Sequence, residues 1–254
     1  MTVGLLTRCF EIRRRITAAA MADKRDVHIS KSLSYLLRHG AIKERLPIDS
    51  NGYVPLGRLL NHNRLKTHRC SVEDIHRIVQ NNEKKRFHLK STVNKNGVAE
   101  EYVCATQGHS INVITPDQEV LKQIKDTSEL PEKLVHGTSI TKALLIVQSG
   151  FISKQSRNHI HLAPGITGVD SQVISGMRNS SNVYIHLNVH ETLLDSLQLY
   201  KSLNNVYLTS DDIPLSLFEK VVIKPPKMDH EVSKDTKALL ELLSRSKVPY
   251  QLLD

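Results

Sequence analysis

Tryptophan is absent from the sequence, and aromatic residues make up only 4% of its 254 positions. A protein that binds RNA by stacking bases on aromatic side chains needs more of them, so this mode of binding is disfavoured. Long apolar runs are missing as well. None approaches the roughly 20 residues that a bilayer-spanning helix requires, which excludes a membrane-spanning protein.

Cysteine is scarce too. Cys9, Cys70 and Cys104 are odd in number and widely spaced, and they include no C-x-x-C pair. This pattern is typical of reduced thiols in an intracellular protein, and it provides neither a disulfide framework nor a zinc knuckle.

Negative charge is deficient in the first half of the chain. Residues 1–125 hold 22 Lys and Arg against 12 Asp and Glu, a net charge of +10, whereas residues 126–254 hold 13 against 14, a net charge of −1. The whole formal charge of +9 therefore comes from the first half. This asymmetry indicates a part that binds a polyanion, joined to a part with another task.

The first 22 residues have a composition of their own. They carry four arginines and a single acidic residue, Glu11. Such a segment is typical of a mitochondrial transit peptide, and equally of an unstructured leader that synthesis from Met21 would omit. We treat residues 1–22 as a leader outside the fold and leave both alternatives open.

The next part of the chain is expected to contain three helices and a hairpin. Gly40 is the expected stop of the first helix, Pro55 suits the first turn of the second, and Ser71-x-x-Asp74 is a capping box for the third. This order is that of a winged helix, a fold often used on nucleic acid, although a generic small α+β domain shares it. The expected helices cover 27–40, 56–60 and 71 onward, and the strands 86–89 and 102–105.

Beyond a proline-containing linker at residues 114–133, the pattern changes to short strands. A helix follows His136-Gly137-Thr138 and stops at Gly150, and a closing helix is expected at 231–246. Strand-like alternation is expected at 160–162, 183–189, 206–208 and 221–223. This pattern predicts a β-rich α+β domain over residues 134–254.

Three cationic clusters stand out, and each has a simple structural alternative. Arg38-His39 comes at the end of a helix, where positive charge is favoured in any case. On an extended strand, Arg157, His159 and His161 would share one face, which suits a cleft for an anion but also a solvated surface. No nearby acidic residue or cysteine completes a metal site there, so no metal is expected. The run over Lys84–Lys90 is either solvated or in contact with phosphates.

Taken together, these segments resemble the NAD-dependent RNA 2′-phosphotransferase family. The resemblance covers about residues 24–224, and the order of its motifs is far more specific than any one of them. The segments that carry it are Ser32–His39, Ile48–Tyr53, Arg64–Thr67, Asn81–Phe87, Ala105–Ser110, His136–Thr138, Ser156–Leu162, Ser175–Arg178 and Val183–Ile185.

The resemblance implies a fold and a reaction. The fold is α+β, with a winged-helix lobe that engages RNA (residues 23–113) and an ADP-ribosyltransferase-like lobe that binds NAD (residues 134–254). In the reaction, the 2′-phosphate left at a tRNA splice junction attacks the nicotinamide-bearing ribose carbon and expels nicotinamide. The 2″-hydroxyl then attacks phosphorus, which releases 2′-OH RNA and ADP-ribose 1″,2″-cyclic phosphate. We therefore expect spliced tRNA and NAD as partners, and neither metal nor membrane. We also expect a monomer in the nucleus and the cytoplasm.

The resemblance also implies roles for individual residues. The catalytic set is Arg38, His39, Arg86 and Arg157. The residues expected to bind NAD are His136, Gly137, Thr138, Ser149, Gly150, Asn158, His161 (in preference to His159) and Arg178. The residues expected to bind RNA are Lys31, Arg64, Lys66, His109 and Ser110.

The chemistry accounts for these residue types. Guanidinium groups stay charged and hold phosphate oxygens in a bidentate geometry, and they stabilise the negative charge that grows during phosphoryl transfer. His39 is expected either to move a proton between the two hydroxyl oxygens or to act as a cationic clamp. Segment Asn182–Leu187 has no acidic residue to activate an acceptor, which suits an acceptor that is already anionic. The alternatives are an ADP-ribosyltransferase that caps terminal phosphates and a non-catalytic winged-helix RNA-binding protein.

Overall fold

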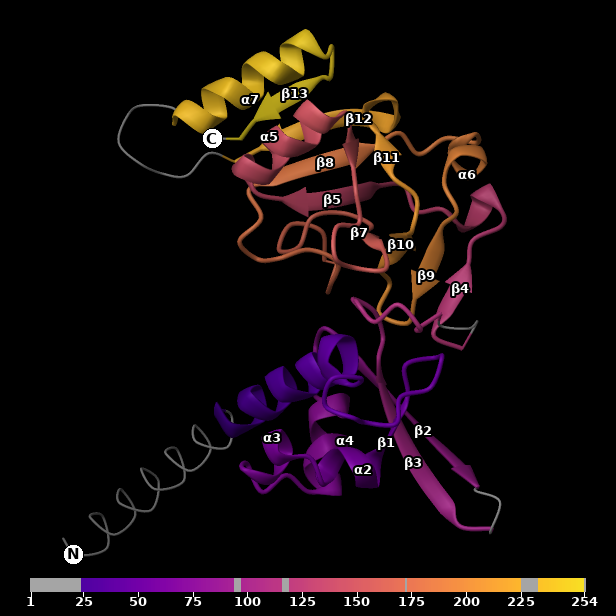
Figure 1. Cartoon of the computed structure of the whole chain (residues 1–254). Helices are drawn as coiled ribbons and strands as arrows, with labels where there is room; N and C mark the ends of the chain where they lie inside the picture. Colours follow the sequence, from indigo (N-terminus) through magenta and orange to yellow (C-terminus); the bar gives the residue numbers. More distant parts are fainter. Residues whose placement is uncertain (1–23, 94–96, 116–118, 172, 225–232, 254) are drawn as a thin grey trace, which may run out of the picture. The chain divides into compact units, whose positions relative to one another are not determined.

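The computed structural model describes residues 24–93, 97–115, 119–171, 173–224 and 233–253 (Figure 1). The expected leader and Cys9 lie outside these ranges. The chain divides into two compact units. Unit 1 combines the described residues up to Asn82 with Phe87–Ala105, and unit 2 combines Glu83–Arg86 with the chain from Thr106 onward. A linker was expected at 114–133, but the two units divide after Ala105. In addition, the short segment Glu83–Arg86, which precedes this division in the chain, belongs to unit 2.

Unit 1 contains helices and a three-stranded antiparallel sheet in the order β1-β3-β2. The expected helices and hairpin are present, together with a short helix at Asn63–Lys66 that the sequence pattern did not predict. The hairpin is longer than predicted, because its pairing extends from Phe87↔Ala105 to Val93↔Ala99. The elements are a helix over residues 24–35 that continues into the π-helical turn η1 (Leu36–Gly40), β1 (Val54–Pro55), α2 (Leu56–Leu60), α3 (Asn63–Lys66), α4 (Val72–Gln80), β2 (Phe87–Val93) and β3 (Ala99–Ala105).

The first helix of unit 1 buries the face that its periodicity predicts. Ile29, Leu33, Leu36 and Leu37 have no exposed surface and belong to one hydrophobic cluster with residues of the other helices and the sheet. Complete burial of such side chains stabilises the fold by about 2 kcal/mol each before the entropy cost of folding is counted. Packing of this face therefore sets the position of the helix.

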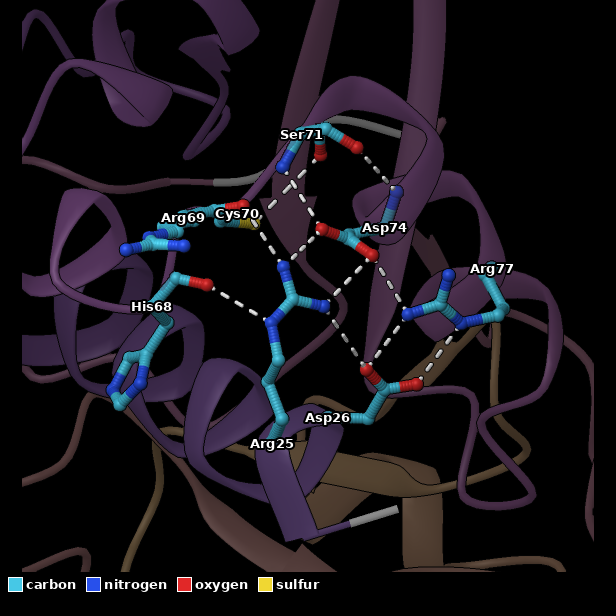
Figure 2. Close-up of polar contacts among 8 residues, drawn as sticks. All are labelled: Arg25, Asp26, His68, Arg69, Cys70, Ser71, Asp74 and Arg77. Carbon is cyan, nitrogen blue, oxygen red and sulfur yellow. Dashed lines mark hydrogen bonds and ion pairs between the residues drawn. The ribbon is translucent and has the colours of Figure 1, made fainter. Parts of the chain in front are cut away.

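Asp74 joins two helices of unit 1 (Figure 2). Its carboxylate accepts hydrogen bonds from Arg25 at 2.6 and 3.0 Å and from Arg77 at 2.7 Å, and it completes the predicted capping box with Ser71. Arg77 also donates to Asp26. The bonds from Arg25, then those from the Ser71 backbone and Arg77, hold the pKa of Asp74 well below its usual range. The network fastens the start of the first helix to the start of α4.

Unit 2 is the expected β-rich α+β unit. Its strands form two four-stranded sheets, β13-β12-β8-β5 and β4-β9-β10-β7, and a two-stranded pair, β11-β6. The elements are β4 (Leu121–Gln123), η2 (Thr127–Glu129), β5 (Leu134–Thr138), α5 (Ile140–Ser149), β6 (Phe151–Ile152), β7 (Ile160–Leu162), β8 (Val183–Leu187), α6 (Leu193–Ser196), β9 (Tyr200–Ser202), β10 (Tyr207–Thr209), β11 (Ile213–Pro214), η3 (Leu215–Leu217), β12 (Phe218–Ile223), α7 (Lys234–Arg245) and β13 (Tyr250–Leu252).

The main core of unit 2 is one hydrophobic cluster to which both four-stranded sheets, the β11-β6 pair and the helices α5, α6 and α7 contribute. Strand β8 runs antiparallel to both β5 and β12, and α5 packs against α7 (Figure 1). Leu239 and Leu243 of α7 have no exposed surface, in agreement with the predicted closing helix, of which residues 231 and 232 lie outside the described ranges. Across the described residues, no helix is both long and apolar enough to cross a membrane.

Cys70 and Cys104, the two cysteines within the described residues, form no disulfide. Burial raises the pKa of Cys70 to about 11. Because the thiolate is the reactive form, the Cys70 thiol is largely protonated and unreactive near neutral pH.

We predict that Asp74→Asn lowers the free energy of unfolding by about 2–3 kcal/mol, because the two arginines lose their shared carboxylate. Urea unfolding measures the change, and Asp26→Asn, which removes the outer partner of Arg77 and a longer 3.9 Å contact with Arg25, should cost less than about 1 kcal/mol. A carboxyl whose pKa is lowered by folding stabilises the protein above its unfolded pKa. The difference between wild type and Asp74→Asn should therefore shrink as the pH falls below about 4. Equal stability of the two proteins at pH 7 would contradict the role of Asp74.

Candidate active site

His136 has a fixed orientation in β5 of unit 2. Its Nδ1 lies 3.1 Å from the carbonyl oxygen of His161 in β7. A carbonyl oxygen only accepts, so Nδ1 carries the proton and Nε2 is left as an acceptor. Burial lowers the pKa of His136; the bond to His161 opposes this shift, and the positive charge of Arg157 adds to it. The ring is therefore neutral near pH 7, with an acceptor nitrogen available to a hydroxyl group.

Glycines allow the loop over residues 173–182 to lie against β5 and Ala163. A Cβ atom on Gly137 would lie 2.6 Å from the Cβ of Met177, and one on Gly176 would lie 2.9 Å from the Cβ of Ala163. Gly176 also has a φ of +108°, a conformation that favours glycine. Gly137 is thus needed for close approach of another part of the chain. The same loop carries Arg178.

Thr138 and Asn182 fix the end of this loop. Thr138 is buried, and its carbonyl oxygen accepts a hydrogen bond from the backbone of Asn182 at 3.0 Å. The side-chain oxygen of Asn182 accepts from the backbone N–H of Ile140, the first residue of α5, at 3.2 Å. Val183 then pairs with Thr138 across β8 and β5. The loop is therefore anchored directly beside the His136-Gly137-Thr138 segment.

Arg157 lies in a bend and not on the predicted strand. Strand β7 covers the expected residues 160–162 and does not extend back to Arg157, so Arg157, His159 and His161 do not share one strand face. The physical reason is that Asn158 binds carbonyl oxygens outside any strand ladder. Its backbone N–H donates to His109 at 2.9 Å, and its Nδ2 to Ile111 at 3.0 Å and Ile114 at 3.2 Å.

These bonds change the interpretation of two predicted contacts. The amide nitrogen of Asn158 is already engaged by the chain, so its side-chain oxygen is the atom that remains for a cofactor. His109 is only 4% exposed, and its carbonyl oxygen holds Asn158. The predicted contact of the His109 side chain with RNA does not fit this burial. Its neighbour Ser110 is half-buried.

Ser149 and Gly150 end helix α5. Gly150 has the left-handed conformation of a helix C-cap, with a φ of +86°, as its predicted stop position requires. The Ser149 hydroxyl lies 3.0 Å from the carbonyl oxygens of Ile146 and Phe151. Both residues thus have a structural role, and contact with NAD stays a prediction for them.

Arg157 and Arg178 lie close enough for their positive charges to interact. Arg157 is exposed, yet partial burial of its guanidinium against the surrounding protein lowers the pKa, and the charge of Arg178 lowers it further. Among the described residues, neither guanidinium forms an ion pair with a carboxylate. Positive charge left uncompensated in this way attracts an anion.

Lys84 and Arg86 add two more cations to this group in unit 2. Lys84 Nζ donates to the side-chain oxygen of Asn179 at 3.0 Å, next to Arg178 in the sequence. Burial lowers the pKa of Arg86, and burial followed by the charge of Arg86 lowers that of Lys84. We call Lys84, Arg86, Arg157 and Arg178 the cationic cluster. Two predicted catalytic residues, Arg86 and Arg157, therefore belong to the same unit as His136.

The other two predicted catalytic residues lie in unit 1, on the turn η1. Arg38 is half-buried, and His39 is exposed. A π-helical turn is rare and is often found at functional sites, where it changes the direction of side chains. The helical segment ends at Gly40, as predicted, but Gly40 is the last residue of this turn, and Ala41 is the cap. A glycine is required at position 40 for packing, because a Cβ there would lie 2.6 Å from the ring of Tyr35.

Three predicted RNA contacts also lie in unit 1 and are exposed. Lys31 lies on the first helix, and Arg64 and Lys66 lie on α3. The guanidinium of Arg64 stacks on the ring of Tyr35, 4.3 Å from its centroid. This stacking holds a cation at the surface of unit 1, where a phosphate can reach it.

The sequence pattern did not single out Asn179 or Asn182, since an asparagine in a polar loop is ordinary. Only the loop's return to β5 makes them important. Lys84 was part of a predicted charge run, but without a reason to separate it from its neighbours. Within the described residues, no group of three His, Cys, Asp or Glu side chains is placed to hold a metal ion.

Comparisons with known proteins agree on one family. The family model described as RNA 2'-phosphotransferase, Tpt1 / KptA family, matches residues 24–211. The tRNA 2'-phosphotransferase of Saccharomyces cerevisiae is 56% identical over 210 residues, which cover 82% of this chain and 89% of the relative. The human tRNA 2'-phosphotransferase 1 is 40% identical over 185 residues (73% and 69%). A probable RNA 2'-phosphotransferase of Bacillus thuringiensis is 29% identical over 189 residues (74% and 91%).

We predict that Gly137→Ala lowers the free energy of unfolding by about 1–3 kcal/mol, because the new methyl group overlaps the Cβ of Met177. Thermal or urea unfolding measures the loss. Gly57→Ala is the matched control, since a Cβ at that helical position meets nothing within 4 Å. The control should be neutral or slightly stabilising. Similar behaviour of the two variants would show that the loop does not need Gly137.

Proposed function

The chain belongs to the RNA 2'-phosphotransferase, Tpt1 / KptA family, and from this membership we propose that it transfers the 2′-phosphate of spliced tRNA to NAD. The observation that carries the proposal is the cationic cluster beside a neutral His136. An anionic phosphate and a ribose hydroxyl are the groups that these side chains bind best. We further propose that the protein acts as a monomer in the nucleus and the cytoplasm.

We assign unit 1 as a winged-helix lobe for RNA and unit 2 as an ADP-ribosyltransferase-like lobe for NAD. Helices followed by an antiparallel hairpin, with exposed cations on α3, support the first assignment. The second is supported by the anchored loop at His136-Gly137-Thr138 and by the uncompensated charge of Arg157 and Arg178. Under this assignment, Arg178 faces the NAD pyrophosphate or the RNA.

NAD would supply the ribose carbon that accepts the phosphate and nicotinamide as the leaving group. The residues of unit 2 fit it, because the His136 Nε2 accepts a hydrogen bond from a ribose hydroxyl while the cations balance phosphate charge. Arg86 and Arg157 hold the oxygens of the RNA 2′-phosphate so that one of them points at its target. They then stabilise the negative charge that grows on these oxygens when the P–O2′ bond breaks.

His39 has the remaining task in the proposed reaction. When the 2″-hydroxyl attacks phosphorus, its proton must leave, and the departing 2′-oxygen of the RNA must gain one. Imidazole is the side chain that most readily both accepts and donates a proton, so the exposed His39 can do both in turn, and in a charged form it can also act as a clamp. We propose the proton transfer as its main role.

The decisive experiment incubates a 2′-phosphorylated RNA oligonucleotide with the protein, with and without NAD. We expect 2′-OH RNA, nicotinamide and ADP-ribose 1″,2″-cyclic phosphate only when NAD is present. A stable ADP-ribosylated RNA end would instead support a capping enzyme. Absence of NAD binding by calorimetry would support a pure RNA-binding protein, and phosphate loss without NAD would overturn the proposed co-substrate.

Arg157→Ala is expected to slow transfer by about 100- to 1,000-fold, because the growing charge on phosphate loses a preorganised cation. Single-turnover rates with excess enzyme measure the effect. Arg245→Ala, which removes an exposed cation at the end of α7, is the charge-matched control and should keep the wild-type rate. Equal rates for both variants would remove Arg157 from the catalytic set.

The affinity for NAD should stay constant from pH 8 down to about 6.5 and weaken below that range. Burial lowers the pKa of His136, so the neutral ring that accepts the ribose hydroxyl persists through the ordinary titration range of histidine. Calorimetry at a series of pH values measures this profile. His136→Ala should lose about 5- to 10-fold in affinity and flatten the profile. An affinity that rises as the pH falls would show that a protonated His136 binds NAD.

A further inference from the structure

The three carbonyl oxygens of Lys84–Arg86 are all held by two residues of unit 2. Lys84 O accepts a hydrogen bond from Asn204 Nδ2 at 3.0 Å, and Lys85 O accepts one from Thr106 Oγ1 at 3.1 Å. Arg86 O accepts the backbone N–H of Thr106 at 2.9 Å. These bonds explain why this segment belongs to unit 2 although the chain on both sides of it belongs to unit 1.

The segment needs such support because its backbone is strained. Lys85 has a φ of +41°, which is unfavourable for a residue with a side chain and costs of order 1 kcal/mol. A conformation of this kind persists only where its surroundings hold it in place. The strained residue directly precedes Arg86, so the direction of the Arg86 side chain depends on the same bonds.

The neighbours of Asn204 direct its amide nitrogen at the carbonyl oxygen of Lys84. It is 1% exposed and lies between β9 and β10. The hydroxyl of Ser202 lies 2.7 Å from Asn204 Oδ1 and also accepts the backbone N–H of Val206 at 3.1 Å. The carbonyl oxygen of Lys84 only accepts, so Nδ2 faces it and Oδ1 faces the Ser202 hydroxyl, whose one proton is shared between Oδ1 and the carbonyl oxygen of Val206 at 2.9 Å. The side chain of Asn204 therefore has one orientation that satisfies all its neighbours.

We propose that Asn204 and Thr106 are positioning residues for Arg86. They act through the backbone of Lys84–Arg86, whereas Arg86 touches the phosphate. The proposal rests on the proposed function, since that function gives Arg86 its role. A phosphate-binding guanidinium has to lie within about 0.5 Å of its productive position, and an error of about 1 Å can cost 100-fold in rate. Neutral amide and hydroxyl groups suit this task, because an anchoring carboxylate would cancel the charge of the cationic cluster.

The test compares variants that remove each anchor. Asn204→Ala removes the donor to Lys84, and Thr106→Val removes the hydroxyl donor to Lys85 with little change in shape. We expect the single-turnover rate at saturating NAD and RNA to fall by up to about 100-fold in each, with the KM for NAD changed by less than about 3-fold. Thr106→Ser restores the donor and should regain most of the rate. Leu203→Ala, an exposed neighbour in the same turn, is the matched control.

A double-mutant cycle with Arg86→Lys separates positioning from general support of the fold. If Asn204 acts through the Arg86 guanidinium, Asn204→Ala should cost less than about 3-fold in rate in the Arg86→Lys background. Its effect on the thermal midpoint should be the same in both backgrounds. An equal loss of rate in both backgrounds, or no loss in either single variant, would overturn the proposal.

The same measurements distinguish a failure of the proposed function from a failure of the positioning roles. If the wild-type protein shows no NAD-dependent phosphate transfer, the proposed function itself fails. If the wild-type protein is active and Arg86→Lys is impaired, while Asn204→Ala and Thr106→Val keep the wild-type rate, only the positioning roles are rejected.

Discussion

Positive charge has to be kept close together in unit 2 without being neutralised by the protein's own carboxylates. Hydrogen bonds between neutral groups achieve this. Asn158 and Asn182 bind the segments that carry Arg157 and Arg178 to backbone groups elsewhere in unit 2, and Asn204 and Thr106 hold the backbone of the segment that carries Arg86. Each of these bonds fixes a segment and adds no negative charge, so the cluster keeps its attraction for phosphate.

In unit 1, by contrast, arginines are paired directly with a carboxylate. Arg25 and Arg77 share the carboxylate of Asp74, and the resulting network joins the first helix to α4. Charges are paired here because the network has only to stabilise the fold. The lowered pKa of Asp74 expresses the same interaction, since the carboxylate is held in its charged form. In each unit, the kind of hydrogen bond thus follows from whether the local charge must remain available to a ligand.

Several local features followed from the sequence because their causes are local. The capping box of α4 needs only Ser71 and Asp74, and the buried face of the first helix needs only its periodicity. The expected strand at 160–162 is present but does not extend back to Arg157, because Asn158 binds carbonyl oxygens more than 40 residues away in the chain. The π-helical turn at Arg38 and His39 was likewise not foreseen, since no local pattern in the sequence marked it.

By itself, the sequence determined the α+β class, most helices and strands, and the family, because periodicity, capping residues and ordered motifs are all properties of neighbouring residues. It also located most of the positive charge in the first half. Only the tertiary structure decided that Lys84–Arg86 belongs to unit 2. That assignment depends on the hydrogen bond from Asn204, 120 residues further along the chain, and on those from Thr106. Contacts between such distant residues leave no periodic signal, so Arg86 could be recognised as important from its motif but could be placed only by the fold.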